Sequence, residues 1–247
     1  MHFKTEGLVL RETEYKDNDK LLTVLTRDRG KMTLRARGVK QKGSRLKSGC
    51  QLLAFSEFTV FENRGFCTIN EAVPKEMFIP LRSDLERMAL ASYFAQVTET
   101  LAQENDPDAD LLSLCLNSVY ALTYLEKSPA MVKAVFEFRA ACQAGYMPQL
   151  SGCAACGADE PDRFCVSAGA LLCAGCAASG DVGIRLPVTS GMIAAMRHIA
   201  SCDMRALFSF RMSEEGERLL SNLTETYLLT QLERGFFTLD FYKSLLI

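Results

Sequence analysis

The stretch LLTVLTRDRGKMTLRARGV, residues 21–39, decides the first part of the fold. Two runs rich in apolar and β-branched residues flank the turn sequence DRG. In the second run Met32, Leu34 and Ala36 alternate with polar or basic residues. Because side chains of a strand alternate between its faces, one face can pack into a core while the other presents cations about 7 Å apart. The stretch therefore predicts strands at 21–27 and 31–39, the second with a basic face.

Three further strand-like segments lie on either side of this stretch, at 5–13, 52–62 and 65–72. In segment 52–62 the apolar positions change parity near Ser56–Glu57, which indicates a bulge or bend. Five short strands within about 75 residues indicate a small closed sheet, for which the OB-fold is the leading candidate. An SH3-like barrel is the alternative, and the periodicity does not separate the two.

Beyond Pro80 the pattern becomes helical. Ser83 with Glu86 predicts a capping box, Ser128 with Pro129 predicts an N-cap and first-turn pair, and Gly145 and Gly235 are candidate helix-terminating residues. We expect helices at 83–103, 110–127, 128–145, 190–201, 213–234 and 240–247. The predicted fold is α+β and multidomain: an N-terminal five-stranded OB-fold β-barrel (1–80), then an all-helical domain (81–247) with an inserted irregular, cysteine-rich module (148–187).

Positive charge is concentrated in one segment. The chain has 28 Lys and Arg against 30 Asp and Glu, yet residues 27–47 hold nine basic residues and one acid. Such a density of one sign destabilises a compact state unless an anionic partner relieves it. A row of cations on a barrel is typical of a nucleic-acid groove, and single strands add base stacking on aromatic faces. Five aromatic residues of the barrel could stack, although we expect most of them to be buried: Tyr15, Phe55, Phe58, Phe61 and Phe66.

Other features narrow the class of protein. No run of about 18 apolar residues and no signal-peptide pattern occurs, so we expect no membrane span and a cytoplasmic location. In that compartment the ten cysteines stay reduced. With His2 and His198 as the only histidines, and no phosphate loop or nucleophile elbow, we expect no enzyme and no catalytic residue.

Four cysteines have metal-ligand spacing. Cys153 and Cys156 form one C-x2-C pair, and Cys173 and Cys176 form a second, sixteen residues further on. This pattern predicts one structural zinc ion held by four thiolates. A redox C-x-x-C pair is the competing interpretation, and Cys165 between the pairs is expected to lie outside the site. Gly157 and Gly175 are expected in tight turns of positive φ.

The chain resembles the RecO family of bacterial DNA repair and recombination mediators. The resemblance rests on YKDND (15–19), TRDRGK (26–31), ARGVKQKGSRLKSG (36–49), FEFRAACQAGYMPQLSGCAACG (136–157) and YKSLLI (242–247). It implies binding of single- and double-stranded DNA, annealing of complementary strands and, with RecR, loading of RecA onto DNA covered by single-strand-binding protein. It also implies a nucleoid-associated location.

Seven DNA-binding residues are carried over from the resemblance: Lys31, Arg35, Arg37, Lys40, Lys42, Arg45 and Lys47. Arg139 is a weak candidate for the pocket that binds the tail of single-strand-binding protein, and a buried ion pair is its expected role. Two alternative functions stay open, an RNA-binding OB-fold protein and a cysteine-based redox protein.

Overall fold

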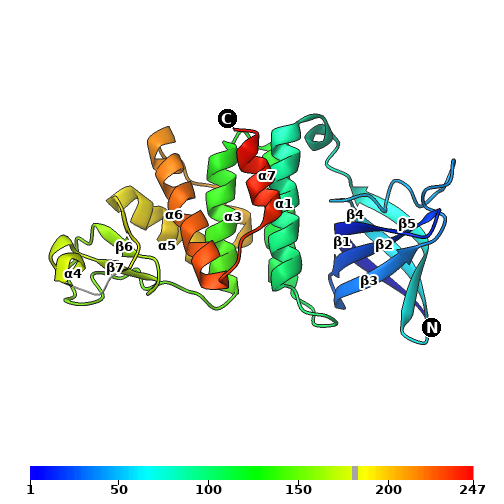
Figure 1. The fold of residues 1–247 in the computed structure, drawn as a ribbon, viewed down its shortest axis with the longest axis horizontal. Coiled ribbons are helices and arrows are strands. Elements are labelled where there is room, and N and C mark those ends of the chain that lie inside the picture. The colour runs from blue at the N-terminus through cyan, green and yellow to red at the C-terminus, as the bar shows by residue number, and fades with distance from the viewer. Residues whose placement is uncertain (180–182, 247) are drawn as a thin grey trace. The chain divides into compact units, whose positions relative to one another are not determined.

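The computed structural model describes residues 1–179 and 183–246 and contains a closed five-stranded barrel (Figure 1). The strands are β1 (His2–Tyr15), β2 (Asp19–Thr26), β3 (Gly30–Ala36), β4 (Phe55–Asn63) and β5 (Phe66–Glu76). They are ordered β1-β2-β3-β5-β4 around the barrel, with β4 paired to β1. The β3–β5 pair is parallel and the other neighbours are antiparallel. This topology is that of an OB-fold, so the OB-fold prediction is confirmed over the SH3-like alternative.

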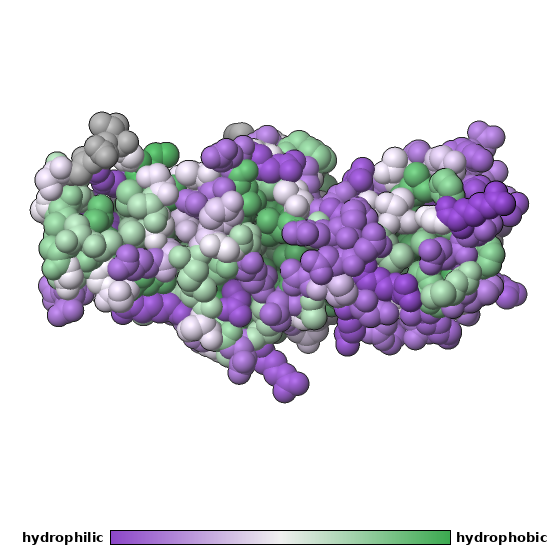
Figure 2. Space-filling model, turned by 90° about the horizontal axis from the view of Figure 1, so that it is seen from below, coloured by the Kyte–Doolittle hydropathy of each residue, from purple (hydrophilic) through white to green (hydrophobic). Residues whose placement is uncertain are grey.

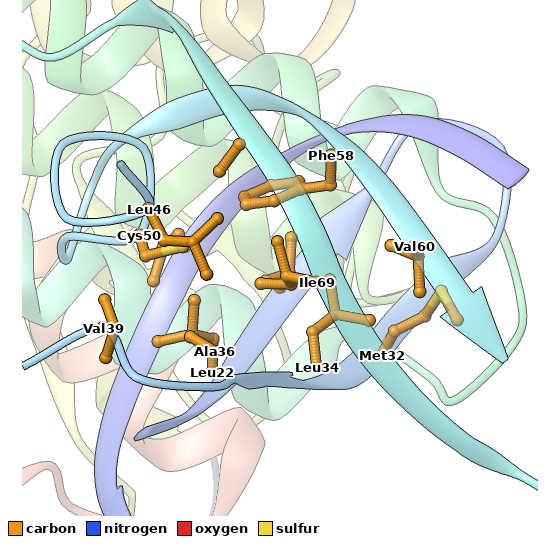
Figure 3. Packing of buried hydrophobic residues seen from close by; sticks show 13 residues of the cluster. Leu22, Met32, Leu34, Ala36, Val39, Leu46, Cys50, Phe58, Val60 and Ile69 are labelled. Carbon is orange, nitrogen blue, oxygen red and sulfur yellow. The ribbon is translucent and has the colours of Figure 1, made fainter. Parts of the chain in front are cut away.

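The barrel interior is filled by apolar side chains from all five strands (Figure 3). Met32, Leu34 and Ala36 of β3 point into it, as the alternation predicts. The pairing of β4 with β5 shifts register between Phe55 and Ser56 and again between Thr59 and Val60. The irregularity predicted near Ser56 is therefore confirmed, and it lets a short sheet coil tightly enough to close.

Helices follow the barrel. They are the 3-10 turn η1 (Ile79–Ser83), α1 (Leu85–Leu101), α2 (Ala109–Tyr124), α3 (Pro129–Gln143), α4 (Ala174–Ser179), α5 (Ser190–Ser201), the 3-10 turn η2 (Met204–Ala206), α6 (Glu214–Leu232) and α7 (Phe237–Ser244). None of the helices in the described residues is both long and apolar enough to span a membrane.

At two helix termini the capping residue differs from the sequence prediction, and α7 begins three residues earlier than expected. The N-cap of α1 is Asp84, whose carboxylate accepts a hydrogen bond from Arg87 N at 3.0 Å, so the Ser83–Glu86 capping box is wrong. The hydroxyl of Ser83 instead donates to Pro80 O. At the end of α6, Glu233 and not Gly235 adopts the left-handed conformation, with φ 51°. The predicted cap of α3 is confirmed, because Ser128 Oγ accepts from Met131 N.

The chain forms two compact units, Met1–Leu125 with the residues from Phe236 onward, and Glu126–Gly235. Within the first unit the start of β3 is tied to the loop after α1: Lys31 N donates to Gln103 O at 3.1 Å, and Asn105 N donates to Lys31 O at 3.3 Å. A Cβ on Gly30 would lie 2.4 Å from the backbone of Asp106, so only glycine fits there. The domain division 1–80 and 81–247 stays a prediction, because these units group barrel and first helices together.

In the second unit α3 packs against α6, and the segment expected to be irregular contains a small sheet. Its antiparallel strands are β6 (Arg163–Cys165), β7 (Ala170–Leu172) and β8 (Arg185–Pro187). The expectation of an irregular module is therefore wrong for these residues. Strands of three residues are too short to show a period of two, which explains why the sequence did not reveal them.

Candidate nucleic-acid interface and metal site

An open groove of about 1060 Å³ lies on the surface of the barrel. Arg35 and Arg37 line it from the end of β3. The turn between β1 and β2 (16–18) and Asp19 at the start of β2 line it as well, as do Phe61 of β4 and residues 68–70 of β5. The structure thus places two of the seven predicted DNA-binding residues in one concave surface.

The connection between β3 and β4, residues 37–54, carries five of the seven predicted residues, Arg37 among them, and is anchored to the barrel. Val39, Leu46 and Cys50 point from this connection into the barrel core (Figure 3) and are buried. Successive turns hold its backbone, with Gln41 N donating to Gly38 O at 3.1 Å and Cys50 N donating to Leu46 O at 3.1 Å. Because its apolar side chains are fixed inside, the connection presents its basic side chains outward.

Lys31 is used by the fold. Its ammonium donates to Glu99 O at 3.0 Å, a carbonyl in the last turn of α1, where a cation is favourable. Together with the backbone bonds of Lys31 to the following loop, this contact holds β3 against the end of α1. The side chain lies on the outward face of β3, as the alternation predicts, but its ammonium is already bound within the fold.

Arg35 and Lys40 pair with carboxylates of the barrel. Arg35 Nη2 lies 2.6 Å from Asp19 Oδ2, and Lys40 Nζ pairs with Glu14. Asp19 also accepts a hydrogen bond from Gly38 N at 2.8 Å. The Gly38 N–H, followed by the Arg35 guanidinium, lowers the pKa of Asp19 below its ordinary value, so the carboxylate is charged when it holds both partners.

The remaining four candidates are exposed: Arg37, Lys42, Arg45 and Lys47. Among residues 1–179 and 183–246, none of the four forms an ion pair. Exposed, unpaired cations on an anchored backbone are available to phosphates without breaking an existing contact.

The aromatic residues of the barrel are more exposed than expected. Of the five candidates only Phe58 is buried, whereas Tyr15, Phe61 and Phe66 are 37%, 38% and 79% exposed. The expectation that most of them are buried is therefore wrong. In the view of Figure 2 the barrel, at the right, accordingly shows apolar spots within a largely hydrophilic surface.

Asp19 lines the groove and Tyr15 lies beside Arg35, although composition did not single out either residue as a partner of Arg35. The Arg35 guanidinium lies 5.5 Å from the centre of the Tyr15 ring, and Asp19 accepts from the same guanidinium. Both residues are in the YKDND segment, which the family resemblance had marked without assigning a role. The YKDND segment was therefore the sequence signal that could have identified these two residues.

The four cysteines with metal-ligand spacing converge in the second unit. The sulfur atoms of Cys153, Cys156, Cys173 and Cys176 all lie within 4.8 Å of one another. The Cys156 and Cys173 sulfurs are 3.8 Å apart, which equals the edge of a sulfur tetrahedron with metal–sulfur bonds of about 2.3 Å. The four residues could therefore hold a metal ion, and this convergence does not fit a single redox pair.

The electrostatics of the cluster also suit a cation. Backbone N–H groups of Cys173 and Cys156 lower the pKa of Cys153, which favours a thiolate there. The neighbouring sulfurs, that of Cys173 first, raise the pKa of Cys176. Four adjacent thiolates repel each other unless a metal ion neutralises them.

Residues around the cluster match the prediction in part. Cys165 lies in β6, outside the group of four, as expected, with its sulfur 3.6 Å from Ser167 Oγ. Gly157 has φ 77° in the turn after the first pair, where its N–H donates to Cys153 O. Gly175 lies in α4 and has no positive φ, so that expectation is wrong.

Arg139 makes contacts within the second unit, and its role in a pocket for the tail of single-strand-binding protein stays a prediction. Its Nη1 atom donates to Ile199 O at 2.8 Å and to Ala200 O at 2.6 Å, the last carbonyls of α5. It thus caps a helix C-terminus, and the expected ion pair is replaced by a structural contact inside the second unit.

These features define an OB-fold protein with a basic groove, joined to helices and a four-cysteine cluster that could bind a metal. Two family models match the chain, "Recombination protein O N terminal" over residues 1–78 and "Recombination protein O C terminal" over residues 82–240. The protein named DNA repair protein RecO of Acetivibrio thermocellus is 33% identical over 99% of this chain and 97% of its own length. The RecO of Alkaliphilus metalliredigens is 27% identical over 99% of this chain and 100% of its own length.

The chain belongs to the RecO family of DNA repair proteins. The resemblance inferred from the YKDND, basic-loop and cysteine motifs is therefore confirmed across the length of the chain.

Proposed function

We propose that this chain binds single- and double-stranded DNA through the barrel groove, anneals complementary strands and, with RecR, helps load RecA onto DNA covered by single-strand-binding protein. Four exposed, unpaired cations on the anchored connection carry the proposal; Arg37 lines the groove, and the other three lie on the same connection, which contributes Gly38, Gln41 and Leu46 to the groove wall. Annealing requires two polyanions to approach each other, and surface cations that neutralise phosphates lower their repulsion. The protein acts by binding, without a catalytic group, in association with the nucleoid.

The four-cysteine cluster is proposed to hold one zinc ion, because an all-thiolate tetrahedral site favours that metal. All four positions are taken by protein ligands, which makes the ion structural. Its effect on DNA binding is then indirect, through the fold of the second unit.

Annealing of complementary oligonucleotides, followed by fluorescence, tests the proposal. Arg37→Glu with Arg45→Glu removes two exposed cations without breaking an ion pair, and annealing should slow markedly. Arg35 is left in place because a glutamate there would face Asp19 and disturb the connection itself. The matched control is Arg205→Glu with Arg211→Glu, two exposed residues outside the barrel that produce the same change in net charge.

A barrel variant that anneals as fast as the wild type at moderate salt would overturn the assignment to the groove. Equal slowing by both double variants would show that only net charge matters. The same assay after metal chelation reports whether the cysteine cluster contributes.

A further inference from the structure

The β4–β5 hairpin ends in a short, tight turn. Arg64 and Gly65 form a two-residue loop between the paired residues Asn63 and Phe66, and their φ angles are 50° and 80°. Positive φ at both central residues is the pattern of a type I′ turn, which matches the twist of the flanking strands. Phe66 follows this turn directly and is 79% exposed, the highest exposure among the large apolar side chains of the described residues.

Phe66 shares a face with the groove. Directly opposed residues of an antiparallel pair lie on the same side of the sheet, and so do residues two apart in one strand. Phe61 is opposite Thr68 and Asn63 is opposite Phe66, so all four side chains lie on one face. Thr68 in turn is aligned with Arg35 of β3, and Phe61, Thr68 and Arg35 all line the groove.

The charge on this face selects the kind of partner. The four hairpin residues that share it are uncharged, Arg64 adds a cation at the tip, and the one acid of the hairpin end, Glu62, belongs to the opposite parity. An exposed ring beside a cation, on a hairpin face that carries no carboxylate of its own, suits a base whose phosphate is bound nearby. In a duplex both faces of an internal base are already stacked, so such a ring has no base to bind.

We propose that Phe66, with Arg64 beside it, is a stacking finger that binds one unpaired base at the end of the groove and gives the protein a preference for single strands. The inference rests on the proposed DNA binding through the groove and adds selectivity to it. Removing the ring should weaken single-strand binding about five- to 150-fold, the range for one stacked base, while duplex binding changes little.

The chain contains no tryptophan, so Phe66→Trp introduces a single fluorescent reporter at the tip. The matched control is Phe237→Trp, at the start of α7, because Phe237 is similarly exposed at 73%. Each variant is titrated with an oligo-dT and with an abasic oligonucleotide of the same length, and binding is followed independently by anisotropy of labelled DNA. Phe66→Leu, which keeps an apolar side chain, measures the loss of affinity.

Quenching of the indole in Phe66→Trp by oligo-dT but not by the abasic strand, with no quenching in Phe237→Trp, supports the finger. Unchanged emission of the Phe66→Trp variant while anisotropy reports binding would overturn the finger and leave the groove proposal intact. No binding of any strand by the wild-type chain would instead remove the proposed function. A blue shift of the Phe66→Trp emission with rising protein concentration in the absence of DNA would assign this face to a second copy of the chain and overturn the inference.

Discussion

The salt dependence of single-strand binding should report how many cations the fold leaves available. Seven basic residues occupy β3 and the connection after it, but their side chains are not equivalent. Lys31 contacts a carbonyl of α1, Arg35 contacts Asp19, and Lys40 contacts Glu14. Each of these three would have to give up a native contact before it could bind a phosphate, whereas the other four would not.

Four available cations and seven available cations predict different salt dependences of single-strand binding. Each phosphate neutralised on a single strand contributes about 0.7 to the slope of log K against log salt. Counting the cations of this segment alone, four give a slope of about −2.8, and seven give about −4.9. Between about 50 and 200 mM salt the affinity should fall about 50-fold in the first case and about 900-fold in the second. We expect the smaller slope.

Anisotropy of labelled oligo-dT, measured over a range of NaCl concentrations, determines this slope. Arg37→Gln or Lys47→Gln should each reduce its magnitude by about 0.7, because each removes one phosphate contact. Lys31→Gln is the control and should leave the slope unchanged, since that ammonium is bound to Glu99 O. A wild-type slope near about −5, or a loss in Lys31→Gln equal to that in Arg37→Gln, would refute the division of the cations into two groups.

Three further outcomes follow from the contacts described. Cys176→Ser should lose bound metal and the hydrogen-exchange protection of β6 and β7. Cys165 lies outside the cluster, so Cys165→Ser should keep both. Equal metal content in the two variants would contradict the metal site. Gly30→Ala should lower the free energy of urea unfolding by about 1–3 kcal/mol from the φ of 65° alone, and a neutral effect contradicts the close approach. Glu137 of α3 is fully buried, with the Lys133 ammonium 3.0 Å from its Oε1 atom, and burial raises the pKa of Glu137 despite that ammonium. The unfolded chain therefore loses the proton first, so the stability of the wild type relative to Glu137→Gln should fall as pH rises above the ordinary pKa of about 4.5 towards the folded pKa, by up to about 1.4 kcal/mol per pH unit. A pH-independent difference in urea unfolding would contradict this ionisation.

Local patterns in the sequence were sufficient for the barrel and for the cysteine cluster. The alternation in β3 is a property of neighbouring residues, and the structure retains it with Leu34 inside and Thr33 outside. The arrangement of the thiols within each C-x2-C pair is likewise set locally, because each pair forms a turn, and the two turns need only to meet. In both cases the information lies within a few residues.

Other features depend on contacts between distant residues and could not be read from a pattern. Phe58 and Phe66 are both aromatic residues of predicted strands, yet one is buried in the core and the other stands beside a turn. The register shifts between β4 and β5 decide which face each residue occupies, and their positions are set by closure of the barrel. The capping residue of α1 was missed for a different, local reason, since Ser83 and Asp84 are adjacent and both can cap.

The number of cations available to a partner is the clearest of these long-range properties. Asp19 precedes Arg35 by sixteen residues, and nothing in the basic segment itself indicates that this carboxylate faces it. An acid within a basic groove weakens the local attraction for anions, but Asp19 also accepts the Gly38 N–H and so fixes the start of the connection. Asp19 therefore neutralises Arg35, but it also helps to fix the connection, whose apolar side chains are already inside the barrel. The connection in turn carries Arg37, Lys42, Arg45 and Lys47. Because an ordered array of charges loses less conformational entropy on binding than a mobile one, fewer cations in fixed positions can bind a polyanion as well as a larger, flexible set.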